Sequence, residues 1–232
     1  MFPTTIDVAG GRIAELRRGP RLAFRVLSTD PVRAALVPVQ AGPLAGDHDI
    51  VRIRVGAGET LILEPIAATL ALPGPARTRL ELHAEVAGRL ILDEPALIVP
   101  AGADVLRITR IELAEGAVVA WRDTVILGRA GEGPGRVEAT TRVTLAGAPL
   151  LHETLRLDPE QDDAYVALPP GHRVAGTVAL LGLPGNLAGP GSLWRATGAT
   201  ASEVDAALRD AWGGASQRVL SQRPERAVSS GV

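Results

Sequence analysis

Two kinds of strand-like segment follow one another along the chain. In residues 51–55 and 137–145, apolar and polar side chains alternate, as in a strand with one face in the core and one in water. The runs that follow, at 61–63 and 150–151, are apolar on both faces, which favours strands buried on both sides. One half-buried strand followed by one buried strand predicts stacked sheets with a shared interior. The alternation changes phase between Ile108 and Ile111, which predicts a β-bulge there.

A glycine turn, a large apolar run and a carboxylate recur together. The glycines follow one another at steps of about 30 residues, a period typical of stacked supersecondary units: Gly58, Gly88, Gly116 and Gly147. The carboxylates at the matching positions are Glu64, Asp93 with Glu94, Asp123 and Glu153. We therefore predict an all-β fold of stacked β-sheets with solenoid-like strand repeats, in which like positions of successive units become neighbours.

One segment near the carboxyl end has helical spacing instead. Val204, Leu208 and Trp212 recur at every fourth position, and Thr200 with Glu203 forms a capping-box pattern at the start. The pair at 213–214 is Gly-Gly, which predicts that a minor C-terminal helix covers 200–212 and ends there. We expect a single β-rich domain over residues 1–214, including this helix, and a disordered tail over 215–232.

Composition excludes several classes of function. Apolar residues make up 46% of the 232 residues but aromatic residues only 3%, so the core must be aliphatic. A net charge of −2 argues against charge-driven nucleic-acid binding. The absence of cysteine excludes disulfides and thiolate sites, and the absence of lysine excludes a P-loop. No apolar run has the length of a membrane span, and the start does not resemble a signal peptide. We expect a cytoplasmic protein that does not bind membranes.

Several short segments stand out together along the chain. Residues 42–47 read Gly-Pro-Leu-Ala-Gly-Asp, 67–69 read Ala-Ala-Thr, 94–98 read Glu-Pro-Ala-Leu-Ile, and 150–153 read Leu-Leu-His-Glu. In this order they resemble motifs of the UreD (UreH) family of urease accessory proteins, and the resemblance extends over about residues 35–212. The motif positions are Gly42, Leu44, Gly46, Asp47, Thr69, Glu94 and Pro95. The chain departs from the family pattern at Pro43, Ala45, Ile66 and Leu70.

The resemblance implies a mostly β-structured protein that is not an enzyme. Members of this family bind the urease apoprotein and the accessory proteins UreF and UreG. They help to deliver nickel to the urease active site, in step with GTP hydrolysis by UreG. The resemblance therefore implies no tightly bound cofactor, transient contact with nickel, and three kinds of protein partner.

The recurring carboxylates are candidates for a transient nickel path. Acids on neighbouring strands, about 4.8 Å apart, repel one another unless a cation, an arginine or water lies between them. Carboxylate oxygens and imidazole nitrogens suit Ni(II). The candidate contact residues are Asp47, His48, Glu64, Asp93, Glu94, Asp123, His152 and Glu153. The alternative is that these acids end strands at the surface and pair with arginine.

Residues 47–49 read Asp-His-Asp and have two interpretations. They are a possible metal site, or Asp47 caps a turn. If the segment is extended, Asp47 and Asp49 point to one side and His48 to the other, so that the three side chains do not converge.

Two other function classes remain open. A β-solenoid can be a binding module that recognises a carbohydrate or a protein, and aspartate and histidine residues can serve a small hydrolase. No Gly-x-Ser-x-Gly elbow supports a serine nucleophile. We expect Trp121 to lie in the core, and Trp194 and Trp212 to pack the C-terminal helix onto the sheet.

Overall fold

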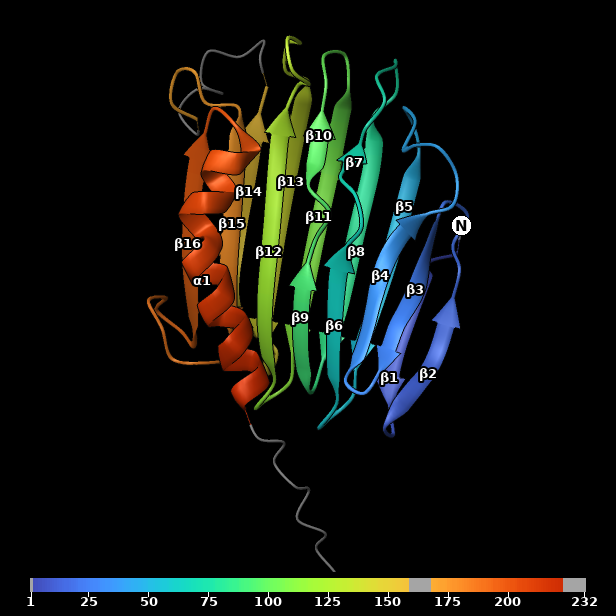
Figure 1. Cartoon of the computed structure of the whole chain (residues 1–232), viewed down its shortest axis with the longest axis vertical. Helices are drawn as coiled ribbons and strands as arrows, with labels where there is room; N and C mark the ends of the chain where they lie inside the picture. Colours follow the sequence, from blue (N-terminus) through green and yellow to red (C-terminus); the bar gives the residue numbers. More distant parts are fainter. Residues whose placement is uncertain (1, 159–167, 223–232) are drawn as a thin grey trace, which may run out of the picture.

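The computed structural model describes residues 2–158 and 168–222 of the chain. In these residues two β-sheets face each other, and a single helix packs on the outside of one of them (Figure 1). The prediction of an all-β fold with a C-terminal helix and stacked, solenoid-like sheets is therefore confirmed. The described residues contain no helix with the length and apolar character needed to cross a membrane.

Seven strands form the first sheet. In spatial order they are β14 (Ala148–Leu157), β13 (Arg136–Leu145), β11 (Asp104–Leu113), β8 (Thr78–Val86), β5 (His48–Val55), β1 (Thr4–Ala9) and β2 (Arg12–Arg17). The neighbours from β13 to β1 are all parallel, and the two edge strands are antiparallel. One face of this sheet lies on the core and the other faces solvent, which explains the alternating pattern of its strands.

The second sheet follows the order β16 (Gly191–Gly198), β15 (Val174–Leu181), β12 (Val118–Leu127), β9 (Arg89–Asp93), β6 (Thr60–Pro65), β4 (Val32–Pro38) and β3 (Leu22–Thr29). The short strands β7 (Thr69–Leu70) and β10 (Leu97–Val99) pair with each other, and β10 also pairs with β12. Strands β4, β6, β9 and β12 are parallel. The helix covers part of the outer face of this sheet, so its strands are apolar on both sides.

Successive strands cross from the first sheet to the second, so that β5–β6, β8–β9 and β11–β12 form stacked coils. Arg89 lies level with Thr60 and with Val118, which places the turns of the three coils above one another. A Cβ atom at Gly88 would lie 2.4 Å from the carbonyl oxygens of Gly56 and Glu59, and the close stacking therefore requires glycine there. These tight turns lie at one end of the coil, and the longer loops with β7 and β10 lie at the other (Figure 1).

The fourth predicted unit does not continue the coil. Strand β14 turns back and pairs with β13 in the first sheet, and β15 takes the next place in the second sheet. The turn residues Ala146 and Gly147 both have a left-handed backbone conformation, with φ angles of 48° and 80°. Two such residues in succession favour a two-residue hairpin turn. Leu150 and Leu151 are consequently half-buried at a sheet edge. The prediction that Glu153 stacks on the other acids is wrong for this reason.

The predicted bulge between Ile108 and Ile111 is also wrong. Strand β11 pairs with both neighbours without a register shift. The alternation changes phase because Arg107 and Thr109 are polar but buried. In a sequence, buried polar residues on a regular strand give the same change of phase as a β-bulge, so the two cannot be told apart from the pattern.

Helix α1 (Ala201–Ser221) begins as expected, because Thr200 and Glu203 form the capping box. It does not end at Gly213-Gly214. The apolar stripe of Val204 and Leu208 continues through Ala215 and Val219, all four of which are buried. Burial of this stripe outweighs the cost of two glycines, about 1 kcal/mol each. Residues 215–221 of the predicted tail are therefore helical, and 223–232 lie outside the described residues. Trp194 and Trp212 pack beside this stripe, as predicted.

Candidate functional site

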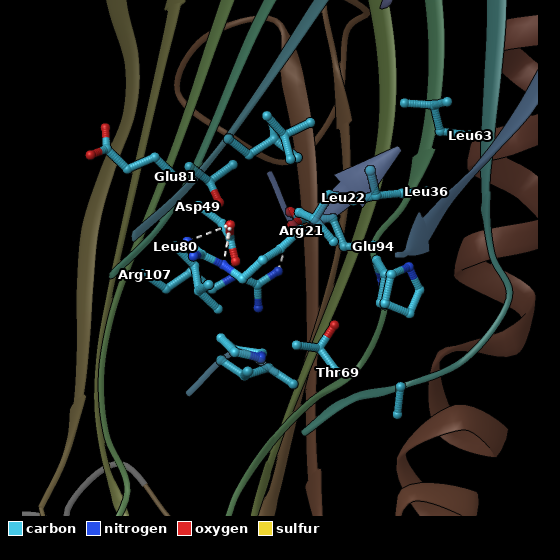
Figure 2. A pocket seen from close by; sticks show the side chains of 18 of the residues that line it. Arg21, Leu22, Leu36, Asp49, Leu63, Thr69, Leu80, Glu81, Glu94 and Arg107 are labelled. Atoms are coloured by element: carbon cyan, nitrogen blue, oxygen red, sulfur yellow. Dashed lines mark hydrogen bonds and ion pairs between the residues drawn. The ribbon is translucent and has the colours of Figure 1, made fainter. Parts of the chain in front are cut away.

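A cavity of about 130 Å³ lies between the two sheets, towards the end of the coil that carries the longer loops (Figure 2). Its deeper wall is apolar and includes Phe24, Val51 and Leu92, which belong to strands of both sheets. Segments that are far apart in the sequence form the rest of its wall: Gly42, Pro43, Ala67, Ala68, Thr69, Glu94 and Pro95. The cavity therefore brings together three of the segments that stood out in the sequence.

Charged side chains line the cavity among these apolar ones. The charged side chains on its wall are Asp49, Glu94, Arg21 and Arg107. Glu64, Asp93 and Glu81 also border the cavity, but their carboxylates point away from it: Glu64 pairs with the exposed Arg33, Asp93 pairs with Arg122 on the side of α1, and Glu81 lies on the outer face of the first sheet. Three of these acids, Glu64, Asp93 and Glu94, were singled out in the sequence as possible nickel contacts. Of these three carboxylates, that of Glu94 faces the space between the sheets, where Arg107 contacts it, whereas those of Glu64 and Asp93 face the outer side of the second sheet.

Arg107 and Glu94 form the most buried ion pair on this wall. The Arg107 guanidinium donates to Glu94 Oε2 at 2.6 Å and also pairs with Asp123, while Trp121 Nε1 donates to Glu94 Oε1 at 2.6 Å. With both carboxylates ionised, one guanidinium faces two negative charges. Burial raises the pKa of Glu94, and the positive charge of Arg107 only partly offsets this effect. Burial acts to lower the pKa of Arg107, but Asp123 and Glu94 outweigh it and raise that pKa.

Arg21 holds the segment at 47–49 on the other side of the cavity. It pairs with Asp47 Oδ1 at 3.1 Å and donates through Nε to Asp49 Oδ1 at 2.9 Å. The backbone N–H of Leu44 donates to Asp47 Oδ2 at 2.8 Å, so Asp47 stabilises the preceding turn. Both aspartates therefore lie on one side of the chain and His48 on the other, as the extended interpretation predicted.

The other acids of the recurring pattern each pair with an arginine. Arg122 contacts Asp93 through two hydrogen bonds, of 2.8 and 2.5 Å, and Arg33 donates to Glu64 at 2.5 Å. Glu153 pairs with Arg195 of β16, at the opposite edge of the molecule from Glu64. His152 accepts from Arg142 on the solvent face of the first sheet. The structure thus brings Glu94 and Asp123 together at Arg107, whereas Glu64 and Asp93 pair with separate arginines on the outer side of the second sheet. His152 and Glu153 lie elsewhere.

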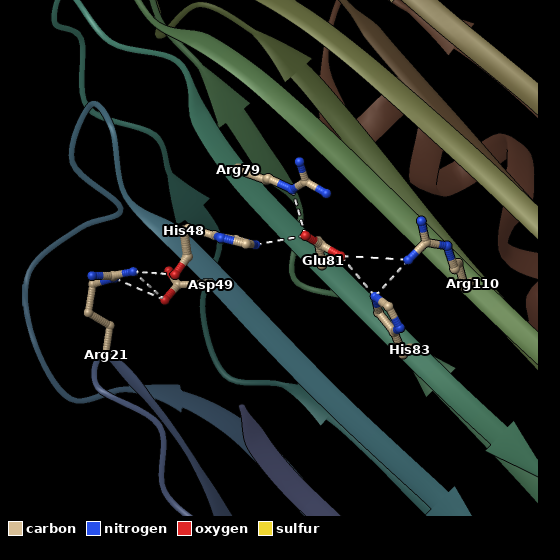
Figure 3. Close-up of polar contacts among 7 residues, drawn as sticks. All are labelled: Arg21, His48, Asp49, Arg79, Glu81, His83 and Arg110. Atoms are coloured by element: carbon tan, nitrogen blue, oxygen red, sulfur yellow. Dashed lines mark hydrogen bonds and ion pairs between the residues drawn. The ribbon is translucent and has the colours of Figure 1, made fainter. Parts of the chain in front are cut away.

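His48 points away from the cavity into a second cluster, on the outer face of the first sheet (Figure 3). Its Nε2 lies 2.7 Å from Glu81 Oε1, and His83 Nε2 lies 3.0 Å from Glu81 Oε2. Arg79 Nε donates to the same carboxylate at 2.5 Å. Burial acts to raise the pKa of Glu81, but the hydrogen bonds from His83, Arg79 and His48 lower it to about 2. Glu81 is therefore ionised at neutral pH.

Sequence reasoning missed Arg107 and Glu81, the two residues around which these clusters are built. A signal for Arg107 was present, because it sits at an inward position of an otherwise apolar alternation. For Glu81 the signal was the i±2 spacing of Arg79 and His83, which places the three side chains on one face of β8, whereas His48 and Arg110 come from the neighbouring strands. Within residues 2–158 and 168–222, no three histidine, aspartate or glutamate side chains are grouped so that they could hold a metal ion.

Comparison with known proteins gives one consistent family. The family model described as UreD urease accessory protein matches residues 15–229. Urease accessory protein UreD 1 of Streptomyces griseus is 38% identical over 218 residues, which cover 87% of this chain and 85% of that protein. Urease accessory protein UreD of Frankia alni is 35% identical over 189 residues, 64% of this chain and 63% of that protein. UreD 1 of Saccharopolyspora erythraea is 35% identical over 159 residues, 67% of this chain and 62% of that protein.

Proposed function

Because the chain belongs to the UreD family of urease accessory proteins, we propose that it is a scaffold for the assembly of the urease metallocentre. In this role it binds the urease apoprotein and the accessory proteins UreF and UreG, and it assists the insertion of nickel. It acts in the cytoplasm and catalyses no reaction itself. Nickel is its cargo, and it needs no resident cofactor.

The observation that carries this proposal is the convergence of the motif positions on one cavity. Gly42, Thr69, Glu94 and Pro95 come from three separate segments of the chain, yet all of them line it. Asp47 reaches the same wall through its ion pair with Arg21. A scaffold with a purely structural core has no need for buried acids beside a cavity, since burying a charge is costly.

The donor set of the wall suits a divalent cation in transit. Glu94 on the wall, and Asp123 next to it on the far side of Arg107, offer carboxylate oxygens, which are hard ligands that Ni(II) accepts. Arg107 occupies these oxygens in the structure, so a cation that passes must compete with the guanidinium for Glu94. This competition keeps any contact weak, and weak contacts allow an ion to leave as well as to enter.

Co-purification tests the scaffold role. The tagged chain, co-expressed with UreF, UreG and the urease subunits, should retain UreF and the urease subunits on an affinity column, since the proposed role requires a complex. A chain that retains none of them, but binds an oligosaccharide or turns over an ester, would contradict the proposal and favour one of the two other function classes.

A further inference from the structure

A row of basic side chains crosses the solvent face of the first sheet. The strand registers place Arg52 beside His83, His83 beside Arg110, Arg110 beside Arg142, and Arg142 beside His152. We call these five residues the basic row. Neighbouring strands lie about 4.8 Å apart, so the row spans roughly 19 Å across β5, β8, β11, β13 and β14.

The basic row is poorly neutralised by the protein itself. Glu81 touches it, with Oε2 lying 3.0 Å from His83 Nε2 and 3.7 Å from Arg110 Nη1, but Glu81 also serves His48 and Arg79 (Figure 3). Among the described residues, no carboxylate is within ion-pair distance of the exposed side chains of Arg52 and Arg142. The contact that Arg142 makes is a hydrogen bond of 3.2 Å to His152.

The nearby acids on this face have other partners or lie further along the strands. Glu85 pairs with Arg54 at 3.3 Å, and Glu138 lies 3.3 Å from Arg77 and 3.7 Å from Arg156. Glu112 is two residues beyond Arg110 on β11, beside Glu85 rather than beside the row. The face around the basic row therefore has an excess of positive charge in a chain whose net charge is −2.

Charge repulsion within such a row acts against the stability of the isolated protein. Like charges directly opposite one another on neighbouring strands are destabilising, and Arg110 and Arg142 are opposite one another. Packing of the sheet does not need these side chains, because they point away from the core. A partner that supplies negative charge would remove the repulsion when it binds.

We propose that the basic row is the docking site for an acidic surface of a protein partner, with carboxylates of the partner facing Arg52, Arg110 and Arg142. Charge complementarity on this scale gives orientation and a fast association rate. A nucleic acid fits less well, since the face lacks the exposed aromatic side chains on which bases stack, and the whole chain is slightly acidic. This proposal does not depend on the cavity or on nickel.

Binding of a fluorescent oligoglutamate peptide to the full chain, followed by anisotropy, tests the proposal. The double variant Arg52→Gln/Arg142→Gln should bind the peptide roughly three- to tenfold more weakly, in line with the loss of two exposed ion pairs. The matched control Arg18→Gln/Arg25→Gln removes two exposed arginines away from this face and should bind as the unchanged protein does. Added salt should weaken binding and reduce the difference.

Two outcomes would overturn the proposal. Equal loss of binding in the two double variants would mean that peptide binding depends on the total charge of the protein and not on the basic row. Tighter binding of an oligothymidylate of equal charge, lost in the Arg52→Gln/Arg142→Gln variant, would mean that the row recognises a nucleic acid. Circular dichroism of both variants checks that each one is folded as the unchanged protein is.

Discussion

Arg107 reaches across the space between the two sheets to Glu94. It extends from β11 of the first sheet, and its Nη2 lies 2.6 Å from Oε2 of Glu94, which follows β9 of the second sheet. The side chains of both residues are almost fully buried, with exposed fractions of 8% and 7%. This ion pair therefore ties the sheets together at the wall of the cavity.

Removal of the Arg107 charge should destabilise the protein strongly. Arg107→Met leaves the buried Glu94 and the partly buried Asp123 without a cation, and breaking a buried pair in this way costs about 3–5 kcal/mol. Urea denaturation followed by circular dichroism measures the loss of unfolding free energy.

The double variant Arg107→Met/Glu94→Gln provides the control for that experiment. It removes one of the two unpaired negative charges, that of Glu94, and should recover part of the lost stability. If the double variant is no more stable than Arg107→Met alone, the unpaired buried charge of Glu94 is not the cause of the loss, and the electrostatic account of this pair is wrong.

The Glu81 cluster should stabilise the protein at neutral pH but not in acid. The pKa of Glu81 is lowered from 4.5 to about 2, so the folded state holds the ionised form more tightly than the unfolded state does. This contribution is present above the unfolded pKa and is lost as the pH falls through the folded pKa. Glu81→Gln should therefore cost up to about 3 kcal/mol of unfolding free energy at pH 7.

The difference between Glu81→Gln and the unchanged protein should shrink steadily from about pH 4.5 towards about pH 2. Urea titrations at several pH values, with the exposed substitution Glu115→Gln as control, measure it. A difference that is constant over this range would show that the loss comes from packing and not from the charge of Glu81.

Two glycines should respond in opposite ways to alanine. At Gly88 the added Cβ would lie 2.4 Å from backbone oxygens of the preceding coil, so Gly88→Ala should lower the melting temperature by several degrees. Gly213 lies inside α1 with no atom near the added Cβ, and Gly213→Ala should raise the stability by about 1 kcal/mol. Melting curves of both variants test the stacking of the turns, and similar shifts in both would contradict it.

The sequence carried enough information for the architecture of the coil but not for its end. The half-buried and buried strands, the turn period and the helix start all follow from local side-chain patterns. The hairpin at Ala146-Gly147 and the passage of α1 through Gly213-Gly214 do not, because tertiary pairing and burial of Val219 decide them. The acids of the cavity could be named from their recurrence, whereas their arginine partners come from distant strands and could not.

Nickel loading of urease tests the proposed role of the cavity most directly. In cells that co-express urease with its accessory proteins, Glu94→Gln should lower the nickel content and the activity of the purified urease. The variant keeps the size of the side chain and leaves Arg107 paired with Asp123. It loses one of the two buried contacts of Glu94, because an amide has a single acceptor oxygen where Arg107 and Trp121 both donate, so its melting temperature should fall moderately. Its co-purification with UreF should stay close to that of the unchanged protein. The matched control Glu115→Gln, an exposed acid at the turn end of the coil, should load urease normally. Full nickel content with Glu94→Gln would contradict a role for this carboxylate in nickel transfer.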